Sequence, residues 1–231
     1  MVTTLTLDGN PPVDVRLIRS SRAKRLSLRV SQLDGAVRLT LPQRCSMSLA
    51  EEFLTDRADW VRKHVGNSAV TQIIGEGAGI PFLGVNRTVV QGSGRTVTVT
   101  DTELQVPAKP DRIGIKLQTF LKERARAAVV AATNAYADRL DVTVGRISLK
   151  DTRSRWGSCS SAGNINYSWR LIMAPAPVLN YVAAHEVAHR LEMNHSNRYW
   201  ANVARIYPDY NTQRAWLRTN GTALHSYRFT T

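Results

Sequence analysis

Three histidines and one glutamate near residue 190 have the types and spacing that metal-dependent hydrolysis requires. His185, Glu186 and His189 form an HExxH motif, and His195 follows six residues after the second histidine. On a helix, positions i and i+4 share a face, so the first two imidazoles can bind one ion. A catalytic zinc site takes three protein ligands and keeps one position open for water. The motif therefore predicts a hydrolytic Zn²⁺ site with His195 as its third ligand.

Two carboxylates compete with His195 for that third position. Glu192 follows His189 by three residues and lies on nearly the same helical face, and Asp209 comes later in the chain. Either could instead orient a ligand imidazole without touching the metal. We expect the helix to end at Asn194, a residue that tolerates left-handed backbone, so that the chain can turn and present His195.

Glu186 is the residue expected to move the proton. Zinc lowers the pKa of a bound water to about 7, and a neighbouring carboxylate can accept the proton of that water. The zinc-bound water, activated by Glu186, would then attack a peptide carbonyl, and the proton would pass to the leaving group. A chance match on an ordinary helix is the alternative, but three of the five histidines of the chain lie in this short stretch.

Further residues could bind substrate or support the ligands. The side chains that could stabilise an oxyanion are Arg155, Arg170, Tyr199 and Tyr210. Trp156, with Gly157 beside it, could shape a strand edge along which an extended peptide pairs. Each of these residues has a structural alternative, namely core packing, a turn or an ion pair.

The composition is that of a folded globular protein without a disulfide framework. The chain has 231 residues, 43% of them hydrophobic, which suits one large domain or two small ones. Its two cysteines, Cys45 and Cys159, form no CxxC motif. The start, MVTTLTLDGN, lacks the regions of a signal peptide, and the longest apolar run is too short to span a bilayer. These features predict a cytoplasmic protein.

Positive charge is spread evenly along the chain. The formal net charge is +13, and segments 1–70, 71–150 and 151–231 contribute +4, +4 and +5. This distribution argues against a basic tail and permits a weak, salt-sensitive attraction to nucleic acid. A solvated basic surface without a dedicated partner is the alternative.

The hydrophobic pattern predicts an α+β fold that begins with a β-rich region. Alternating apolar and polar residues at 13–18, 25–30 and 36–41 are typical of half-buried strands. A helix capped by Ser46 or Ser48 should follow and run to about residue 65. Short strands separated by glycine turns should continue to residue 107.

The second half should be organised by two helices. A long amphipathic helix is predicted at 110–140, and strands at 145–150 and 164–172 should form a hairpin just before the HExxH helix. We expect residues 1–107 to form the β-rich region and residues 108–231 the metal-binding domain, although the two could be one continuous domain.

The segment from Arg153 to Leu217 also carries a family resemblance. It contains, in order, the stretches SRWGSCSSAGNINYSWRLIMAP, YVAAHEVAHRLEMNHSNRYW and PDYNTQRAWL. In this combination the segment resembles the YgjP-like metallopeptidase family, related to the SprT-like and WLM zinc peptidases. The resemblance implies a zincin-like C-terminal domain in which a mixed sheet packs on the HExxH helix, and a Zn²⁺-dependent peptidase activity.

Three functions fit these observations. The first is a zinc metallopeptidase acting on a peptide or protein. The second is a metal-dependent nucleotide pyrophosphatase, which the positive charge would suit, although no phosphate loop or carboxylate cluster for Mg²⁺ is present in the sequence. The third is a nucleic-acid-associated binding protein with a zinc site, although structural zinc sites normally have four protein ligands. Hydrolysis of casein or of a nucleoside triphosphate would separate the first two, and salt-dependent DNA binding would support the third.

Overall fold

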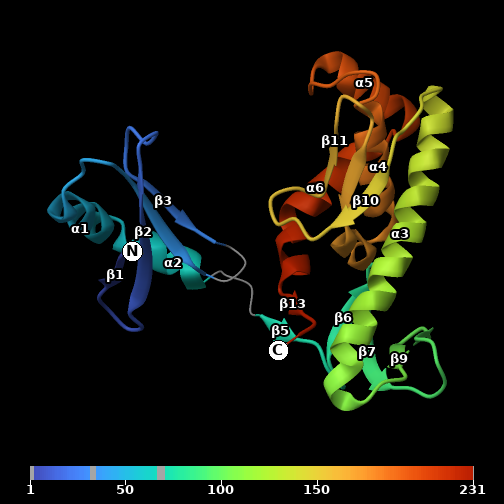
Figure 1. Ribbon diagram of the computed structural model, residues 1–231, viewed down its shortest axis with the longest axis horizontal. Helices are drawn as coiled ribbons and strands as arrows, with labels where there is room; N and C mark the ends of the chain where they lie inside the picture. Colours follow the sequence, from blue (N-terminus) through green and yellow to red (C-terminus); the bar gives the residue numbers. More distant parts are fainter. Residues whose placement is uncertain (1–2, 32–34, 67–70, 231) are drawn as a thin grey trace. The chain divides into compact units, whose positions relative to one another are not determined.

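The computed structural model describes residues 3–31, 35–66 and 71–230 (Figure 1). The chain forms two compact units, Met1–Thr71 and Gln72–Thr231, and both combine helices with small sheets, as an α+β fold requires. The expected division at residue 107 lies inside the second unit, where the short strands share a hydrophobic core with the long helix. Within the described ranges, no helix is long and apolar enough to cross a membrane.

The N-terminal unit is a four-stranded sheet with two helices packed on one face. Its strand order is β1-β2-β4-β3; β2 and β4 are parallel, and the outer pairs are antiparallel. Alternate residues of β2 and β4 are buried and share a core with Ala50, Leu54 and Val61 of the helices. The elements are β1 (Thr3–Leu7), β2 (Val13–Ser20), β3 (Ser27–Val30), β4 (Val37–Pro42), α1 (Met47–Asp56) and α2 (Ala58–Gly66).

The single helix predicted to reach residue 65 is in fact two helices. Ser46 caps α1, because its Oγ accepts a hydrogen bond from the Leu49 N–H at 3.3 Å. Arg57 is the C-cap of α1, and its N–H donates to the carbonyl oxygens of Leu54 and Thr55 in the last turn. The second helix, α2, begins at the next residue. This break allows both helices to bury apolar residues against the same sheet.

The second unit is built around α3 (Ile113–Leu140), which has buried residues along its whole length. The long helix predicted at 110–140 is confirmed; a 3-10 turn, η1 (Pro110–Arg112), precedes it, and Asp141 ends it in the left-handed conformation with φ 53°. A sheet of order β6-β7-β9-β8 shares its core. The strands before α3 are β5 (Gln72–Ile73), β6 (Gly79–Phe82), β7 (Val85–Gln91), β8 (Thr98–Val99) and β9 (Glu103–Val106).

The hairpin predicted from the strands at 145–150 and 164–172 is wrong. β10 (Ile147–Lys150) and β12 (Ile165–Ser168) are parallel neighbours. The polar connection between them contains a further strand, β11 (Gly157–Cys159), which pairs antiparallel with the other side of β12. β11 is therefore an edge strand, and it contacts the HExxH helix, α4 (Ala176–Ala188).

The C-terminal segment returns to the start of the second unit, where β13 pairs with β5. The remaining elements are η2 (Trp169–Met173), α5 (Asn197–Ile206), α6 (Tyr210–Asn220), η3 (Gly221–His225) and β13 (Tyr227–Arg228).

Arg170 holds this returning segment in place. The residue is buried, and its Nε and Nη2 donate to the Asp151 carboxylate at 2.6 and 3.2 Å. Its Nη1 donates to the carbonyl oxygens of Leu224 and Tyr227 at 3.0 and 3.1 Å. Burial alone would raise the pKa of Asp151, but the hydrogen bonds and charge of Arg170 more than offset this, and the pKa is lowered. Asp151 therefore stays ionised and paired.

Replacing Arg170 should loosen the C-terminal segment. Arg170→Met should lower the free energy of unfolding by roughly 3 kcal/mol, because two carbonyl oxygens and a carboxylate lose their donor. Asp151→Asn keeps an acceptor oxygen and should cost only about 1 kcal/mol. Denaturant unfolding measures both. A methionine variant as stable as the parent chain would show that these bonds do not hold the segment.

Candidate metal centre

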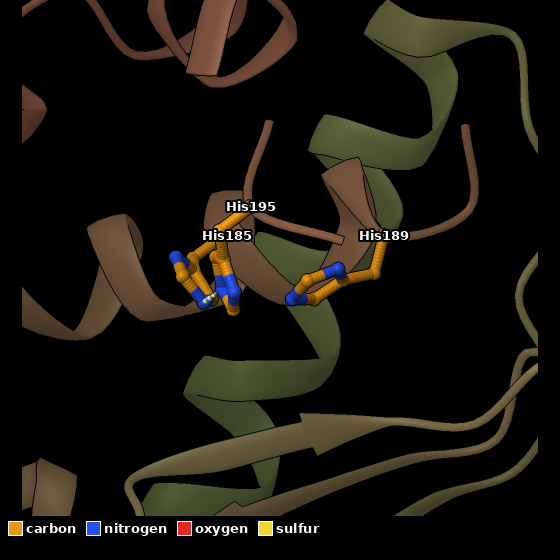
Figure 2. Close-up of side chains that lie close together, drawn as sticks. All are labelled: His185, His189 and His195. Carbon is orange, nitrogen blue, oxygen red and sulfur yellow. Dashed lines mark hydrogen bonds between the residues drawn. The ribbon is translucent and has the colours of Figure 1, made fainter. Parts of the chain in front are cut away.

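The three histidines singled out from the sequence lie together in the second unit (Figure 2). His185 belongs to the last turn of α4, His189 is its C-cap, and His195 lies in the loop before α5. One ring nitrogen of each lies within 4.8 Å of the others, and the Nε2 atoms of His185 and His195 are 3.2 Å apart. Three imidazole nitrogens that converge in this way form a donor set suited to a divalent cation such as Zn²⁺.

Contacts outside the cluster fix the orientation of two of the rings. His189 Nδ1 lies 3.1 Å from the Glu192 carbonyl oxygen, to which it donates, so its Nε2 keeps a lone pair for the cluster. The Tyr199 ring stacks on His189 at 4.5 Å between centroids, and its hydroxyl donates to the His185 carbonyl oxygen at 2.9 Å. Tyr199 therefore links α5 to both α4 histidines.

The surroundings keep the imidazoles in the form that binds metal. Burial, together with the neighbouring histidines and Arg214, lowers the pKa of His185 to about 3. Burial also lowers the pKa of His189, although the Glu192 carbonyl opposes it. Metal ligation needs a neutral imidazole. The buried Nδ1 of His185 has no hydrogen-bond partner among the described residues, so a lone pair or N–H remains free on this ring.

The turn that presents His195 is made differently from the one expected. The helix ends at Ala188, six residues before Asn194. Among the described residues, the non-glycine residues with a positive φ are Leu83 and Asp141, so the backbone of Asn194 is not left-handed. Instead, its Nδ2 donates to Glu192 Oε1 at 2.7 Å, and its Oδ1 accepts from the Ser196 N–H at 2.8 Å. The helix has ended before Asn194, and this residue stabilises the loop through the hydrogen bonds of its side chain.

The two carboxylates considered as rival ligands lie outside the cluster. Glu192 orients His189 through its backbone carbonyl, while its carboxylate bonds to Asn194. Asp209 stands at the start of α6 and accepts hydrogen bonds from Thr212 and Gln213 at 2.6 and 3.0 Å. A carbonyl oxygen thus does the orienting that we expected from a carboxylate.

Glu186 lies directly beneath the edge strand β11. It is 4% exposed, and a Cβ atom at Gly157 would stand only 2.3 Å from its Oε1. Any side chain at position 157 would therefore displace the carboxylate. Burial raises the pKa of Glu186 to about 8, opposed by the charge of Arg155 and a backbone hydrogen bond from Cys159.

A cavity of about 600 Å³ opens onto these groups. Glu186 and all three histidines line it, with Arg155 and Trp156 of the predicted residues. The sequence analysis did not single out four largely apolar lining residues, which are Tyr181, Val182, Met193 and Leu217. Helical spacing could have identified Tyr181, which precedes His185 by four residues, but Leu217 is contributed by the separate helix α6.

Two other predicted residues serve elsewhere. Arg170 anchors the C-terminal segment, and Tyr210 stacks on Trp200 at 5.2 Å between centroids and 18° between planes. Neither lines the cavity. Trp156 does line it, and its ring also lies against Gly221 and His225 of η3.

A cavity with three converging imidazoles and a buried carboxylate is of the kind used for metal-dependent hydrolysis. The comparisons with known proteins agree: the model of the YgjP-like metallopeptidase domain matches residues 24–220. The chain belongs to this family of metallopeptidases.

Comparisons with curated proteins and with solved structures add no further information about the site. None of the curated proteins compared with the chain matches it significantly. A crystal structure of the metallopeptidase zymogen of Pyrococcus abyssi abylysin is similar at 18% identity with a TM-score of 0.36, over 40% of this chain and 92% of the other. At that TM-score the likeness carries no argument about the site.

Removing one imidazole should abolish tight metal binding. We expect the chain to bind one equivalent of Zn²⁺, and His195→Ala to weaken the affinity by at least about 100-fold, more than the loss of an outer contact would. Elemental analysis and competition with a chelator measure this. His64→Ala, which removes a histidine of α2 outside the cluster, is the matched control. Full zinc retention by His195→Ala would exclude it as the third ligand.

Proposed function

We propose that the chain is a zinc-dependent peptidase in which Glu186 transfers the proton. The observation that carries the proposal is the position of Glu186, buried under an edge strand in the cavity that the three histidines share. Family membership supports a metallopeptidase, and the site residues supply the finer assignment.

His185, His189 and His195 would hold the metal through their converging ring nitrogens. Three nitrogen ligands suit Zn²⁺, which, when bound, lowers the pKa of water and polarises a carbonyl oxygen. Tyr199 and the Glu192 carbonyl keep the rings in position for this. Arg155, exposed at the cavity, is placed to attract a negatively charged or polar oxygen of the substrate.

Glu186 would take a proton on its carboxylate and pass it to the amine of the leaving group. A base is most effective when its pKa lies near the working pH, and burial has moved this carboxyl well above its ordinary value. The charge of a nearby cation would lower the pKa again. The hydrogen bond from the Cys159 backbone holds the carboxylate in one position.

The register of β11 favours an extended peptide as the substrate. The Ser168 N–H donates to the Trp156 carbonyl, so in this antiparallel pair the next hydrogen-bonded residue is Ser158. The backbone groups of Gly157 and the carbonyl of Cys159 therefore point away from β12, toward the free edge, while the Cys159 N–H, on the same side, is bonded to the Glu186 carboxylate. An extended peptide could pair with that edge beside Glu186.

Replacing the carboxylate should stop the reaction without emptying the site. Glu186→Gln should lower kcat/KM on a casein-derived peptide by about 10²- to 10⁴-fold, the usual contribution of a general base, while zinc content stays unchanged. Nucleoside triphosphate serves as the competing substrate. Hydrolysis of the triphosphate and not of the peptide by the parent chain would contradict the peptidase assignment.

Gly157→Ala tests the contact between β11 and Glu186. The added Cβ must push the carboxylate aside, and a shift of about 1 Å can cost 10²-fold in rate. We therefore expect a large loss of kcat with zinc binding retained. The neighbouring substitution Ser158→Ala, which removes a hydroxyl without crowding Glu186, is the control. Equal activity of Gly157→Ala and the parent chain would refute this role.

A further inference from the structure

The open face of the N-terminal sheet carries three arginines in one row. Arg16 of β2 is the direct neighbour of Arg38 in β4, and Arg38 is the direct neighbour of Arg29 in β3. Side chains of directly paired residues point to the same face, and all three are exposed. The three belong to successive strands of the chain, and the strand order β2-β4-β3 places Arg38 between the other two.

Within the described part of the chain, the arginine row has no partner that would explain it. None of the three guanidinium groups forms an ion pair or hydrogen bond with another described residue. Neighbouring strands lie about 4.8 Å apart, and like charges placed directly opposite one another destabilise a sheet. The row therefore places three like charges side by side, an arrangement that lowers the stability of a sheet.

Charge is also divided between the two sides of this unit. The helical side, from Arg44 to Lys63, carries four basic and four acidic side chains and is electrically balanced. The connection from β2 to β3, which crosses the end of β4, adds three exposed basic residues to those of the row. They are Arg22, Lys24 and Arg25. Most of the excess positive charge of the unit thus lies on its open face and this connection; Arg19 is a further basic residue, which donates to the carbonyl oxygens of Gln43 and Cys45. Among the described residues of the open face, the acidic side chain is Asp14, which accepts a hydrogen bond from Thr6.

The other side chains of the open face argue against a membrane surface or a single-stranded nucleic acid as the partner of the arginine row. Exposed or half-exposed hydroxyls flank the row, at Thr4, Ser27 and Thr40. The exposed large apolar residues of the described N-terminal unit, Leu49 and Trp60, belong to the helices instead. An interfacial membrane site would need apolar side chains to insert, and a single-strand site would need aromatic rings for bases to stack on.

We propose that this arginine face, formed by Arg16, Arg29 and Arg38, binds the phosphate backbone of a nucleic-acid duplex. Guanidinium groups bind phosphate oxygens in pairs, and hydroxyls commonly donate to the same oxygens. Contacts of this kind position a duplex without reading its sequence. The inference rests on the N-terminal unit alone and does not depend on the proposed peptidase activity.

The test is duplex binding by the full chain across a salt series. Fluorescence anisotropy of a short labelled DNA duplex should give an affinity that falls as salt rises. In the triple variant R16Q/R29Q/R38Q, the slope of log K against log salt should decrease in magnitude by about 3, roughly one for each lost phosphate contact. The matched control is R44Q/R57Q/K63Q, which removes the same charge from the helical side and should keep most of the slope.

Further measurements make the result decisive. Thermal unfolding of Arg38→Gln should show a midpoint no lower than that of the parent chain, because the central charge of the row is removed; a lower midpoint would assign the row to stability. Equal losses in the two triple variants would assign binding to net charge and overturn the proposal. Absence of duplex binding at low salt, tighter binding to the single strand, or binding to anionic phosphatidylserine vesicles in place of the duplex would also overturn it.

Discussion

The candidate site of the second unit depends on the burial of polar, titratable side chains by the helix α4. Most of this helix is buried, and burial strongly disfavours charge on the side chains that it carries inward. For His185 and His189 this is useful, because a neutral imidazole is the form that binds metal. For Glu186 the same burial raises the pKa, which brings the carboxyl into the range where it can both accept and release a proton.

Neighbouring elements stabilise the buried polar groups by hydrogen bonding to them or to their backbone. Tyr199 from α5 and the Glu192 carbonyl orient the histidines, and the Cys159 backbone holds Glu186. Each of these contacts comes from a segment that follows or precedes α4 by several residues. The site is therefore a product of packing between elements, and α4 alone would not keep the three imidazoles and the carboxylate in place.

The close approach of β11 brings Glu186, the proposed base, next to the strand edge where a substrate could pair. Only a glycine allows this distance, since a Cβ at Gly157 would overlap the carboxylate. The connection between β10 and β12 contains this edge strand, and its residues 154–159 line the cavity. Trp156, which precedes Gly157, packs on His225 of η3. Arg170 in turn donates a hydrogen bond to the Leu224 carbonyl oxygen of η3.

The sequence by itself determined the local features, which depend on residue type and short-range spacing. It predicted the HExxH helix, the long helix α3, the alternating strands of the N-terminal unit and the candidate ligands His185, His189 and His195. Spacing of four residues on a helix, or two on a strand, fixes which side chains share a face, whatever the rest of the fold does.

Tertiary structure alone decided the features that join distant segments. The parallel pairing of β10 with β12, the carbonyl of Glu192 as the partner of His189, and the use of Arg170 as an anchor depend on backbone positions that no local pattern encodes. The charge distribution shows the difference most clearly. Basic residues are spread evenly along the sequence, yet strand order gathers Arg16, Arg29 and Arg38 into one row, because lateral neighbours in a sheet are set by topology and register and not by distance along the chain.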